Sequence, residues 1–511
     1  MTTQHLTDVV VIGAGPTGLT TANLLADLGV NVTLIERTAG TSDAPRAISI
    51  TDESLRVMEE IGIMDRLAPE ALLDTGARYF GRKDQLIADV RPSSSRLGQP
   101  GKSQFDQPVL DGLLLDAART RANITLMFDT EVTHVENVDD GVVASLASGD
   151  SVTAKWLVAC DGGKSPVRTQ FNVKLIGSTQ VQKWIVLDII NSKLAPEHFA
   201  EFHCNGTRPV VVVPGVNGRR RYEFMLLPGE TEEQVTTNEF IMNLVEPFEK
   251  IQASDIRRAA VYVAHQRVAA DYRIGHVLLV GDAAHLMPPF AGQALNAGVR
   301  DAANVAWKLA AVLKSGAPEN LIDTYAEERR PHAADMVRLS HRIGKVVMST
   351  NSFGTAFRDG FIKATGLVPP LKRWITGMRF LKQPHYTSGC LVTDVPGAPR
   401  PVLLLVGRSL SQPRVEKVKG DAIPLDKLLG TGWVSLRFEG DGQLVIAPLT
   451  KGTGTITSDV TVHDSDNLFA AIPAGVSLIV RPDRYVAAAV PTEKDAVARG
   501  KLSSYVPELT P

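Results

Sequence analysis

Residues 8–18 read DVVVIGAGPTG, a short apolar run that leads directly into the glycine pattern Gly13-x-Gly15-x-x-Gly18. A continuous β-branched run of this kind is typical of a strand buried on both faces of a parallel sheet. The residues that follow carry apolar side chains at helical spacing, so a strand, a tight turn and a helix are predicted in succession. In that arrangement Gly13 permits the turn, Gly15 lets a phosphate approach the backbone, and Gly18 allows the helix to pack closely on the sheet.

A second apolar run, VNVTLI at residues 30–35, ends in Glu36-Arg37 and completes a βαβ unit of the usual ~30 residues. A carboxylate at the end of this strand, about 20 residues beyond the glycines, can bind both hydroxyls of a ribose. The phosphates of a dinucleotide would lie at the positive N-terminus of the helix. The sequence therefore predicts a dinucleotide site with contacts from Gly13, Gly15, Pro16, Thr17, Gly18, Glu36 and Arg37.

A second strand, loop and helix follow far downstream. Residues 277–280 (VLLV) predict a buried strand that ends at Gly281-Asp282, and a long helix is expected from about Ala294. Asp282 can accept a hydrogen bond from a ribityl chain, and the helix N-terminus would stabilise an anionic flavin edge. A dehydrogenase that binds only NAD does not need this second site, so FAD is the expected dinucleotide. Contacts from this segment are expected at Gly281, Asp282, Pro289, Gly292, Ala294, Leu295 and Asn296.

Three separated motifs together resemble the class A flavoprotein aromatic hydroxylases. They are the glycine turn, residues 160–168 (CDGGKSPVR) and the Gly281-Asp282 segment. The middle motif is similar to the Asp-Gly motif of that family, which implies that Asp161 serves both FAD and the nicotinamide donor. The resemblance spans about residues 5–345 and is specific in combination.

The same comparison implies two further contacts and shows two departures. Gln107, four residues before Asp111, resembles the family's glutamine that touches the flavin, and Arg46 lies where the family often has an FAD-contacting arginine. The family usually has glycine where this chain has Ala294 and arginine where it has Lys164. A methyl group at Ala294 requires a negative φ or a shifted loop near the flavin. Lysine keeps the charge but loses bidentate phosphate binding.

Four stretches, 219–230, 259–262, 265–269 and 328–332, resemble the 3-(3-hydroxyphenyl)propionate hydroxylases. This resemblance implies an FAD monooxygenase that uses NADH or NADPH and O₂ to hydroxylate a phenolic ring beside its existing hydroxyl. The route it implies is a C4a-hydroperoxyflavin, which an electron-rich ring attacks. The alternatives are a tailoring hydroxylase for a polycyclic, polyketide or N-heteroaromatic ring, another flavin oxidoreductase such as an oxidase, and a non-catalytic FAD-binding protein.

Such chemistry needs a group that helps to deprotonate the phenol and a pocket that excludes water. His265 and Tyr262 are candidates for the base. Their odd separation on one regular strand would make them face opposite ways, so only one can point inward. Arg221 is a candidate for holding a substrate carboxylate, and Met287 and Phe290 are candidates for the walls of the ring pocket.

The expected fold class is α/β. A Rossmann-like FAD-binding domain is expected over residues 1–174 and 271–384, including helices at its end. Strand-like stretches in residues 175–270 predict an inserted antiparallel sheet that binds the substrate. Residues 46–130 are interpreted as mixed helix and loop.

Residues 385–511 are long enough for a further domain, and several strands are expected in it, one of them at 402–406. The family resemblance implies a thioredoxin-like domain. The three cysteines of the chain, Cys160, Cys204 and Cys390, include no CxxC pair, so this domain would be a structural, redox-inactive version. Neither a disulfide scaffold nor a metal site is expected.

The composition argues against several other classes. The formal net charge is −2, with 54 basic and 56 acidic residues, so no nucleic-acid partner is expected. No run of about 18 apolar residues occurs and no signal peptide is recognised, so no membrane partner is expected and the localisation predicted is cytoplasmic. The expected partners are a small aromatic substrate and O₂. A homodimer is the working expectation for the assembly.

Overall fold

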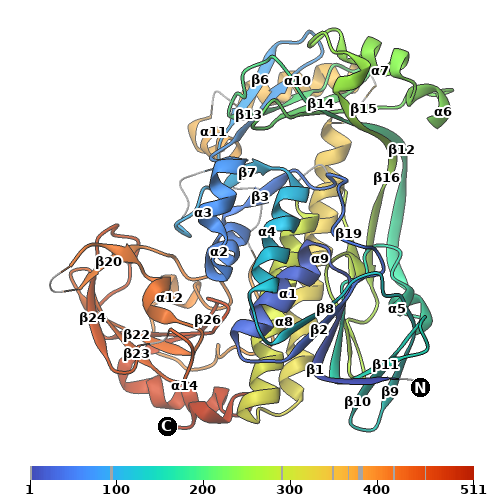
Figure 1. Cartoon of the computed structure of the whole chain (residues 1–511). Coiled ribbons are helices and arrows are strands. Elements are labelled where there is room, and N and C mark those ends of the chain that lie inside the picture. The colour runs from blue at the N-terminus through green and yellow to red at the C-terminus, as the bar shows by residue number, and fades with distance from the viewer. Residues whose placement is uncertain are drawn as a thin grey trace.

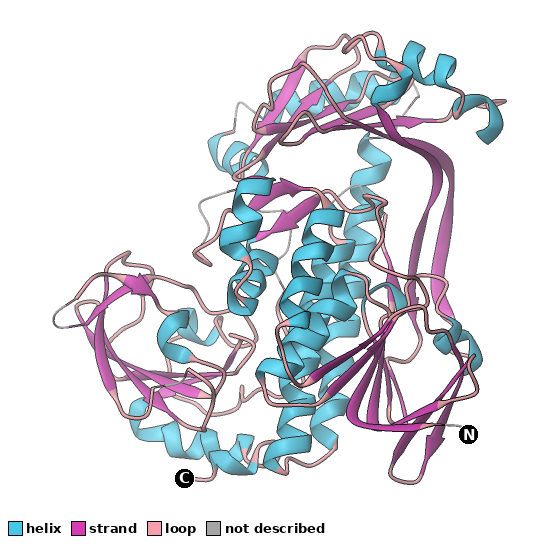
Figure 2. Cartoon of the chain, in the orientation of Figure 1, coloured by secondary structure: helices cyan, strands magenta, loops and turns pink. Residues whose placement is uncertain are grey.

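Two sheet layers, a set of long helices and a smaller third body make up the computed structural model of the chain (Figure 1). The structure describes residues 3–92, 96–288, 292–347, 350, 352–365, 368–377, 384–417, 420–454 and 456–511. Figure 2 shows the strands gathered at the lower right, across the top and in the body at the lower left, with helices between them. Within the described ranges, no helix has the length and apolar character needed to cross a bilayer.

The first sheet contains the predicted βαβ unit. Its strands are β1 (Gln4–Ile12), β2 (Val32–Ile35), β8 (Ile124–Met127), β9 (Val132–Val138), β10 (Gly141–Leu146), β11 (Ser151–Ala159), β17 (Arg273–Ile274) and β18 (Val277–Leu279). In the order β17-β18-β11-β1-β2-β8, the pairs from β18 to β8 are parallel. Residues 9–12 are buried, as their apolar run predicts. Because the strands are parallel, their carboxyl ends meet at one edge, where ligands bind in open α/β sheets.

Long helices cover this sheet. They include α1 (Pro16–Asp27), α2 (Asp52–Ile61), α4 (Gln107–Arg119), α8 (Ala294–Ser315) and α9 (Asn320–Val347). At the crossing of α1 and α8, a Cβ on Gly298 would lie only 2.3 Å from Thr17 Oγ1. The two helices can therefore approach closely because position 298 is glycine. This contact brings the N-terminal end of α8 beside the glycine turn that precedes α1.

The second sheet forms the upper layer in Figure 1. Its order is β19-β16-β12-β15-β14-β13-β5-β6. The strands are β5 (Gly76–Phe80), β6 (Leu86–Val90), β12 (Leu175–Ile189), β13 (Phe199–His203), β14 (Val210–Pro214), β15 (Arg220–Met225), β16 (Ile256–Ala269) and β19 (His285–Leu286). The long strands β12 and β16 run from the first sheet to this upper layer (Figure 1). Helix α7 (Asn238–Val245) lies on its outer side, and α10 (Ser352–Thr365) contacts β6.

The extent of this sheet corrects the sequence interpretation. The expected insert was residues 175–270, and residues 46–130 were interpreted as helix and loop. Instead, β5 and β6 come from the latter segment and extend the sheet, β5 by parallel pairing with β13. A small sheet of β3 (Ser49–Thr51), β4 (Ala71–Leu72) and β7 (Lys102–Phe105) also forms there. These strands are short and pair with partners distant in sequence, so local periodicity gives little sign of them.

The described residues of 385–511 form a body of their own, built on an antiparallel sheet in the order β21-β20-β24-β23-β22-β25-β26. The strands are β20 (Arg414–Lys417), β21 (Ile423–Pro424), β22 (Val434–Gly440), β23 (Gln443–Pro448), β24 (Val460–Asp464), β25 (Val476–Val480) and β26 (Val486–Pro491). The strand expected at 402–406 is absent, because helix α12 (Arg400–Leu403) and a turn occupy this segment. The thioredoxin-like assignment stays a prediction.

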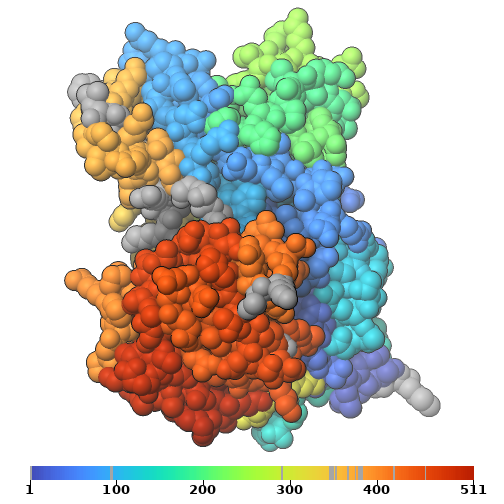
Figure 3. Space-filling model, turned by 90° about the vertical axis from the view of Figure 1, so that its left-hand side faces the viewer, coloured from blue at the N-terminus to red at the C-terminus, as the bar shows by residue number. Residues whose placement is uncertain are grey.

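A buried ionic cluster ties this body to the long helices. Arg481, between β25 and β26, donates to both carboxylate oxygens of Glu328 on α9, at 2.8 and 2.9 Å. Glu328 also accepts from Lys308 on α8 at 2.8 Å, and Arg481 donates to Asp483. The four side chains are at most 1% exposed. Figure 3 shows the result, with the orange and red surface of this body lying against the rest of the molecule.

We expect Arg481→Met to lower the free energy of unfolding by about 3–5 kcal/mol, because two buried carboxylates lose a shared partner. The denaturant midpoint measures this loss. The matched control is Arg437→Met in the same body, whose ion pair with Asp459 is about half exposed. That variant should lose about 1 kcal/mol or less. Equal losses in the two variants would contradict a structural role for the buried cluster.

Candidate functional site

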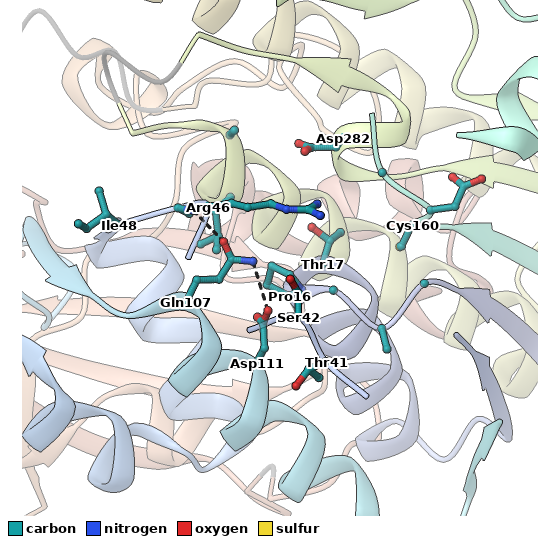
Figure 4. A pocket seen from close by; sticks show the side chains of 18 of the residues that line it. Pro16, Thr17, Thr41, Ser42, Arg46, Ile48, Gln107, Asp111, Cys160 and Asp282 are labelled. Carbon is teal, nitrogen blue, oxygen red and sulfur yellow. Dashed lines mark hydrogen bonds between the residues drawn. The ribbon is translucent and has the colours of Figure 1, made fainter. Parts of the chain in front are cut away.

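One large cavity lies between the edge of the first sheet and the inner face of the second. Its volume is about 630 Å³. Its floor is made by the glycine turn, the end of β2 and the start of α8, and its opposite wall by β13, β14 and β15. Figure 4 shows side chains from the glycine turn, the loop after β2, α4 and the Gly281 segment around this space.

The three glycines of the turn have distinct surroundings. A Cβ on Gly13, where φ is +103°, would lie 2.5 Å from the carbonyl oxygen of Cys160, and a Cβ on Gly18 would lie 1.9 Å from the carbonyl oxygen of Gly13. A Cβ on Gly15 would meet nothing within 4 Å. Gly13 and Gly18 are therefore needed for packing of the turn, whereas Gly15 faces the open cavity. Pro16 and Thr17 line the same floor.

Glu36 at the end of β2 is held by the backbone around it. Its Oε2 accepts a hydrogen bond from the Ala14 N–H at 2.8 Å, and its Oε1 accepts from the N–H and the hydroxyl of Thr38 at 3.0 and 2.9 Å. These bonds fix the carboxylate next to the glycine turn. Arg37 lines the cavity beside it. The end of β2 therefore places a fixed carboxylate acceptor, Glu36, and a cation, Arg37, beside the glycine turn.

Gln107 and Arg46 approach the cavity from the other side of the turn. Gln107 Oε1 accepts from the Ala47 N–H at 2.7 Å, and its Nε2 donates to Asp111 at 3.2 Å (Figure 4). Burial raises the pKa of Asp111 to about 7, while the Gln107 bond and Arg46 act in the opposite direction. Arg46 extends across the cavity toward the side on which Asp282 lies (Figure 4). The spacing of four residues therefore serves to orient the glutamine on α4.

The Asp161 motif and the Gly281 motif are tied together. Arg168 donates to the Gly163 carbonyl at 2.8 Å and to the Ala283 carbonyl at 3.0 Å. Asp161 Oδ2 accepts from the Val167 N–H at 3.1 Å. Its Oδ1 is buried and has no hydrogen-bond partner among the described residues, although Asp161 lines the cavity. Lys164 is exposed.

A buried carboxylate, Asp301 on α8, holds the Gly281 turn in place. Its Oδ2 accepts from the Gly281 N–H at 3.1 Å and pairs with His285 Nε2 at 2.7 Å, while its Oδ1 accepts from Arg329 at 2.7 Å. The three charged or polar side chains are fully buried. The turn therefore presents Asp282 to the cavity, where burial within the walls raises the pKa of that carboxyl and His285 and Arg46 lower it.

The start of α8 accommodates Ala294 without a strained backbone. Ala294 is the first residue of the helix and does not have a positive φ, so the methyl group needs no left-handed backbone. Leu295 lines the cavity beside it. Asn296 instead binds the chain around it, with Oδ1 accepting from the Thr51 N–H and its Nδ2 donating to the Gly292 carbonyl. Pro289 and Phe290, also expected at this site, lie outside the described residues.

The wall opposite the turn is mostly apolar. Ala200 and Phe202 on β13 and Val211 and Val213 on β14 line the cavity, with Met287 from the loop after β19. Three charged side chains also line it, Arg221 and Glu223 on β15 and Lys102 on β7. Glu223 and Lys102 were missed from the sequence. A charged residue at an inward position of a strand is the signal that could have found Glu223.

Arg221 lines the cavity, but most of its donors are engaged within the protein. Its Nε donates to Asp188 at 2.7 Å, and its terminal nitrogens donate to the carbonyls of Pro45 and Arg46. Its side chain is 2% exposed. Arg221 therefore holds the loop that carries Arg46, and its direct contact with substrate stays a prediction.

The two candidates for the base point to opposite faces of the sheet, as their odd separation on one strand predicts. His265 is exposed, its Nδ1 lies 2.9 Å from Thr179 Oγ1, and it does not line the cavity. This placement removes His265 from the candidates. Tyr262 faces inward, and its hydroxyl donates to Glu223 Oε2 at 3.3 Å. Burial raises the pKa of Tyr262 well above its usual value, and Glu223 adds to that shift.

Comparison with known proteins gives close relatives over nearly the whole chain. A family described as FAD binding domain matches residues 6–340. A 3-(3-hydroxy-phenyl)propionate/3-hydroxycinnamic acid hydroxylase of Mycolicibacterium smegmatis is 37% identical over 87% of this chain and 79% of its own length. A hydroxylase of the same name from Klebsiella pneumoniae is 35% identical, covering 95% of this chain and 92% of the relative.

Solved structures share the fold. The flavin-dependent monooxygenase PieE, in complex with FAD and substrate, superposes with a TM-score of 0.78 at 20% identity, covering 99% of each chain. Aklavinone-11 hydroxylase, with FAD and aklavinone, gives 0.77 at 24% identity over 98% of this chain and 99% of its own. The family match covers well over half of the chain and the relatives are hydroxylases. The chain therefore belongs to the FAD-binding domain family and is an FAD-dependent aromatic monooxygenase.

Proposed function

We propose that this enzyme uses NADH or NADPH and O₂ to add a hydroxyl beside the existing hydroxyl of a small phenol. The favoured substrate is one that carries a carboxylate chain, such as 3-(3-hydroxyphenyl)propionate. The observation that carries this proposal is the single cavity in which a nucleotide-binding turn faces a largely apolar wall. The names of relatives that are 35–37% identical support the substrate class.

The residues of the turn and the two loops fit FAD. Gly15 leaves the space a pyrophosphate needs, Glu36 is preset for a ribose, and Asp282, which lines the cavity, suits the ribityl chain. Arg46, Gln107 and the start of α8 would bind the flavin end. When bound, the cofactor supplies hydride acceptance from the nicotinamide and activation of O₂. The protein must bind and orient the ring and keep water away from it.

Lys102 is the candidate for holding the carboxylate of the substrate. It lines the cavity, and no ion pair or side-chain hydrogen bond to it is found among the described residues. Burial lowers its pKa to about 8, so an ammonium group there is stabilised when an anion binds beside it. Arg221, the earlier candidate for this role, is already engaged by Asp188. The charge of Lys102 therefore favours an anionic substrate.

The first prediction tests the reaction itself. The purified protein should be yellow, and 3-(3-hydroxyphenyl)propionate should accelerate its NAD(P)H oxidation with uptake of O₂. Mass spectrometry should find a product heavier by one oxygen atom. The control substrate is 3-phenylpropionate, which lacks the activating hydroxyl and should yield no hydroxylated product. A protein that binds FAD and hydroxylates no phenol would contradict the proposed function.

The second prediction separates binding from packing at the glycine turn. Gly15→Ala should leave the unfolding temperature of the FAD-free protein nearly unchanged but weaken FAD binding by about tenfold or more, because the methyl occupies the space for the phosphates. Gly18→Ala should destabilise the FAD-free protein itself, because its methyl clashes with the Gly13 carbonyl. Calorimetry and a flavin fluorescence titration measure the two effects. Unchanged FAD affinity in Gly15→Ala would place the pyrophosphate elsewhere.

The third prediction concerns Lys102. Lys102→Met should raise the KM for 3-(3-hydroxyphenyl)propionate by about 10- to 100-fold, since a hydrogen bond to a charged group contributes about 1.5–3 kcal/mol. The KM for 3-ethylphenol, which has no carboxylate, should change little. Steady-state kinetics on the two substrates provide the comparison. Equal losses for both substrates would show that Lys102 supports the fold or the flavin instead.

A further inference from the structure

Glu223 occupies an unusual place on the substrate-facing wall. Successive residues of β15 point to opposite faces, so Arg221, Glu223 and Met225 share the inner face. Glu223 pairs with Val211 of β14 on one side and with Val186 of β12 on the other. It is 7% exposed and lines the cavity. Among the described lining residues, it is the one carboxylate that the second sheet contributes.

The five remaining carboxylates that line the cavity all lie at the nucleotide-binding side. They are Glu36, Asp111, Glu131, Asp161 and Asp282. Three of them are already bonded within the protein, Glu36 to the glycine turn, Asp111 to Gln107 and Asp161 to the Val167 N–H. Glu223 is therefore the acidic group best placed for a ring that rests against the apolar wall.

Two side chains contact Glu223 and influence its pKa. The Tyr262 hydroxyl donates to Oε2 at 3.3 Å, and Arg221 lies 3.9 Å from Oε1. Arg221 lies closer to Asp188, at 2.7 Å, so its guanidinium neutralises the negative charge of Glu223 only in part. Burial raises the pKa of Glu223, and Asp188 adds to the rise while Arg221 opposes it. A carboxylate kept in this state is a stronger proton acceptor than one in water.

We propose that Glu223 accepts the hydroxyl proton of the bound phenol, and that Tyr262 orients the accepting carboxylate. This inference rests on the proposed function and names a catalytic residue for it. The carboxylate binds the phenol O–H directly, whereas Tyr262 acts through Glu223 as a positioning residue. The apolar wall around the pair excludes water that would compete for the same hydrogen bond.

The proton balance of this step is closed within the site. The phenol O–H bond breaks, its electron pair stays on the oxygen and enters the ring, and the proton moves to a Glu223 oxygen. This makes the neighbouring ring carbon a better nucleophile. After oxygen transfer, that carbon loses its hydrogen as a proton when the ring becomes aromatic again, and this proton is used to form water from the second oxygen atom of O₂. Glu223 returns its own proton to the phenol oxygen. Glu223 therefore ends the cycle ionised, as it began.

The test uses Glu223→Gln, which keeps the shape and hydrogen-bonding capacity but cannot take up a proton. With a phenol of ordinary pKa, kcat should fall by about 10²–10³-fold, as expected for loss of a general base. The dissociation constant of the substrate and the unfolding temperature should change little. Tyr262→Phe should cause a smaller loss of kcat, since the carboxylate remains.

A series of ring-fluorinated phenols with decreasing pKa provides the decisive readout. The ratio of wild-type to Glu223→Gln turnover removes the intrinsic reactivity of each ring from the comparison. This ratio should shrink toward one as the phenol becomes ionised at the assay pH, because an ionised substrate needs no base. A ratio that is constant across the series would overturn the proposal and leave Glu223 with a structural role.

The chain offers a matched control on the opposite face of the same strand. Tyr222, next to Glu223, donates to the buried Glu249 at 2.8 Å, which makes a second Glu–Tyr pair outside the cavity. Glu249→Gln should show no dependence on phenol pKa, and a dependence equal to that of Glu223→Gln would also overturn the proposal. If the wild-type enzyme hydroxylates no phenol, the proposed function fails first and is distinguished from failure at Glu223.

Discussion

The pairing of Asp301 with Arg329 is the interaction on which the flavin side of the molecule depends. A fully buried carboxylate is costly unless it is paired and hydrogen-bonded, and Asp301 meets this requirement with Arg329, His285 and the Gly281 N–H. The geometry of the Gly281-Asp282 turn is thereby fixed from inside α8. Loss of Arg329 would leave the buried charge of Asp301 without its ion-pair partner directly behind the turn. The geometry of the cofactor site therefore depends on an ion pair between α8 and α9.

The same helices connect this turn to the C-terminal body. Arg329 lies 3.4 Å from the hydroxyl of Tyr386, whose ring stacks on Tyr485 with centroids 4.4 Å apart. Tyr485 in turn donates to the buried Glu53 on α2 at 2.6 Å, and Glu53 pairs with Arg300 of α8. A body that has no CxxC pair therefore still contacts the residues that support the flavin turn. Its contribution is mechanical support of α8 and α9.

The sequence predicted the parts of the site that depend on local patterns. The glycine turn, Glu36 and the Gly281-Asp282 segment each combine a buried strand with a loop, and the structure brings them to one cavity. It did not predict β5 and β6, because both strands are short and because β5 joins the sheet through β13, which is distant in sequence. The period of two showed correctly that His265 and Tyr262 face opposite ways, but parity alone cannot decide which faces inward.

Glu223 shows more clearly what the sequence alone cannot predict, because its surroundings depend on how β15 pairs with β14 and β12. Read alone, the run Arg221-Tyr222-Glu223 looks like a polar strand with one aromatic residue. Only pairing with β14 and β12 places Val211 and Val186 beside Glu223, on the face that lines the cavity. The same pairing places Arg221 next to Asp188, which accepts a hydrogen bond from its Nε. The register of β15 with its neighbours therefore engages Arg221 in a structural ion pair and leaves the Glu223 carboxylate available for chemistry.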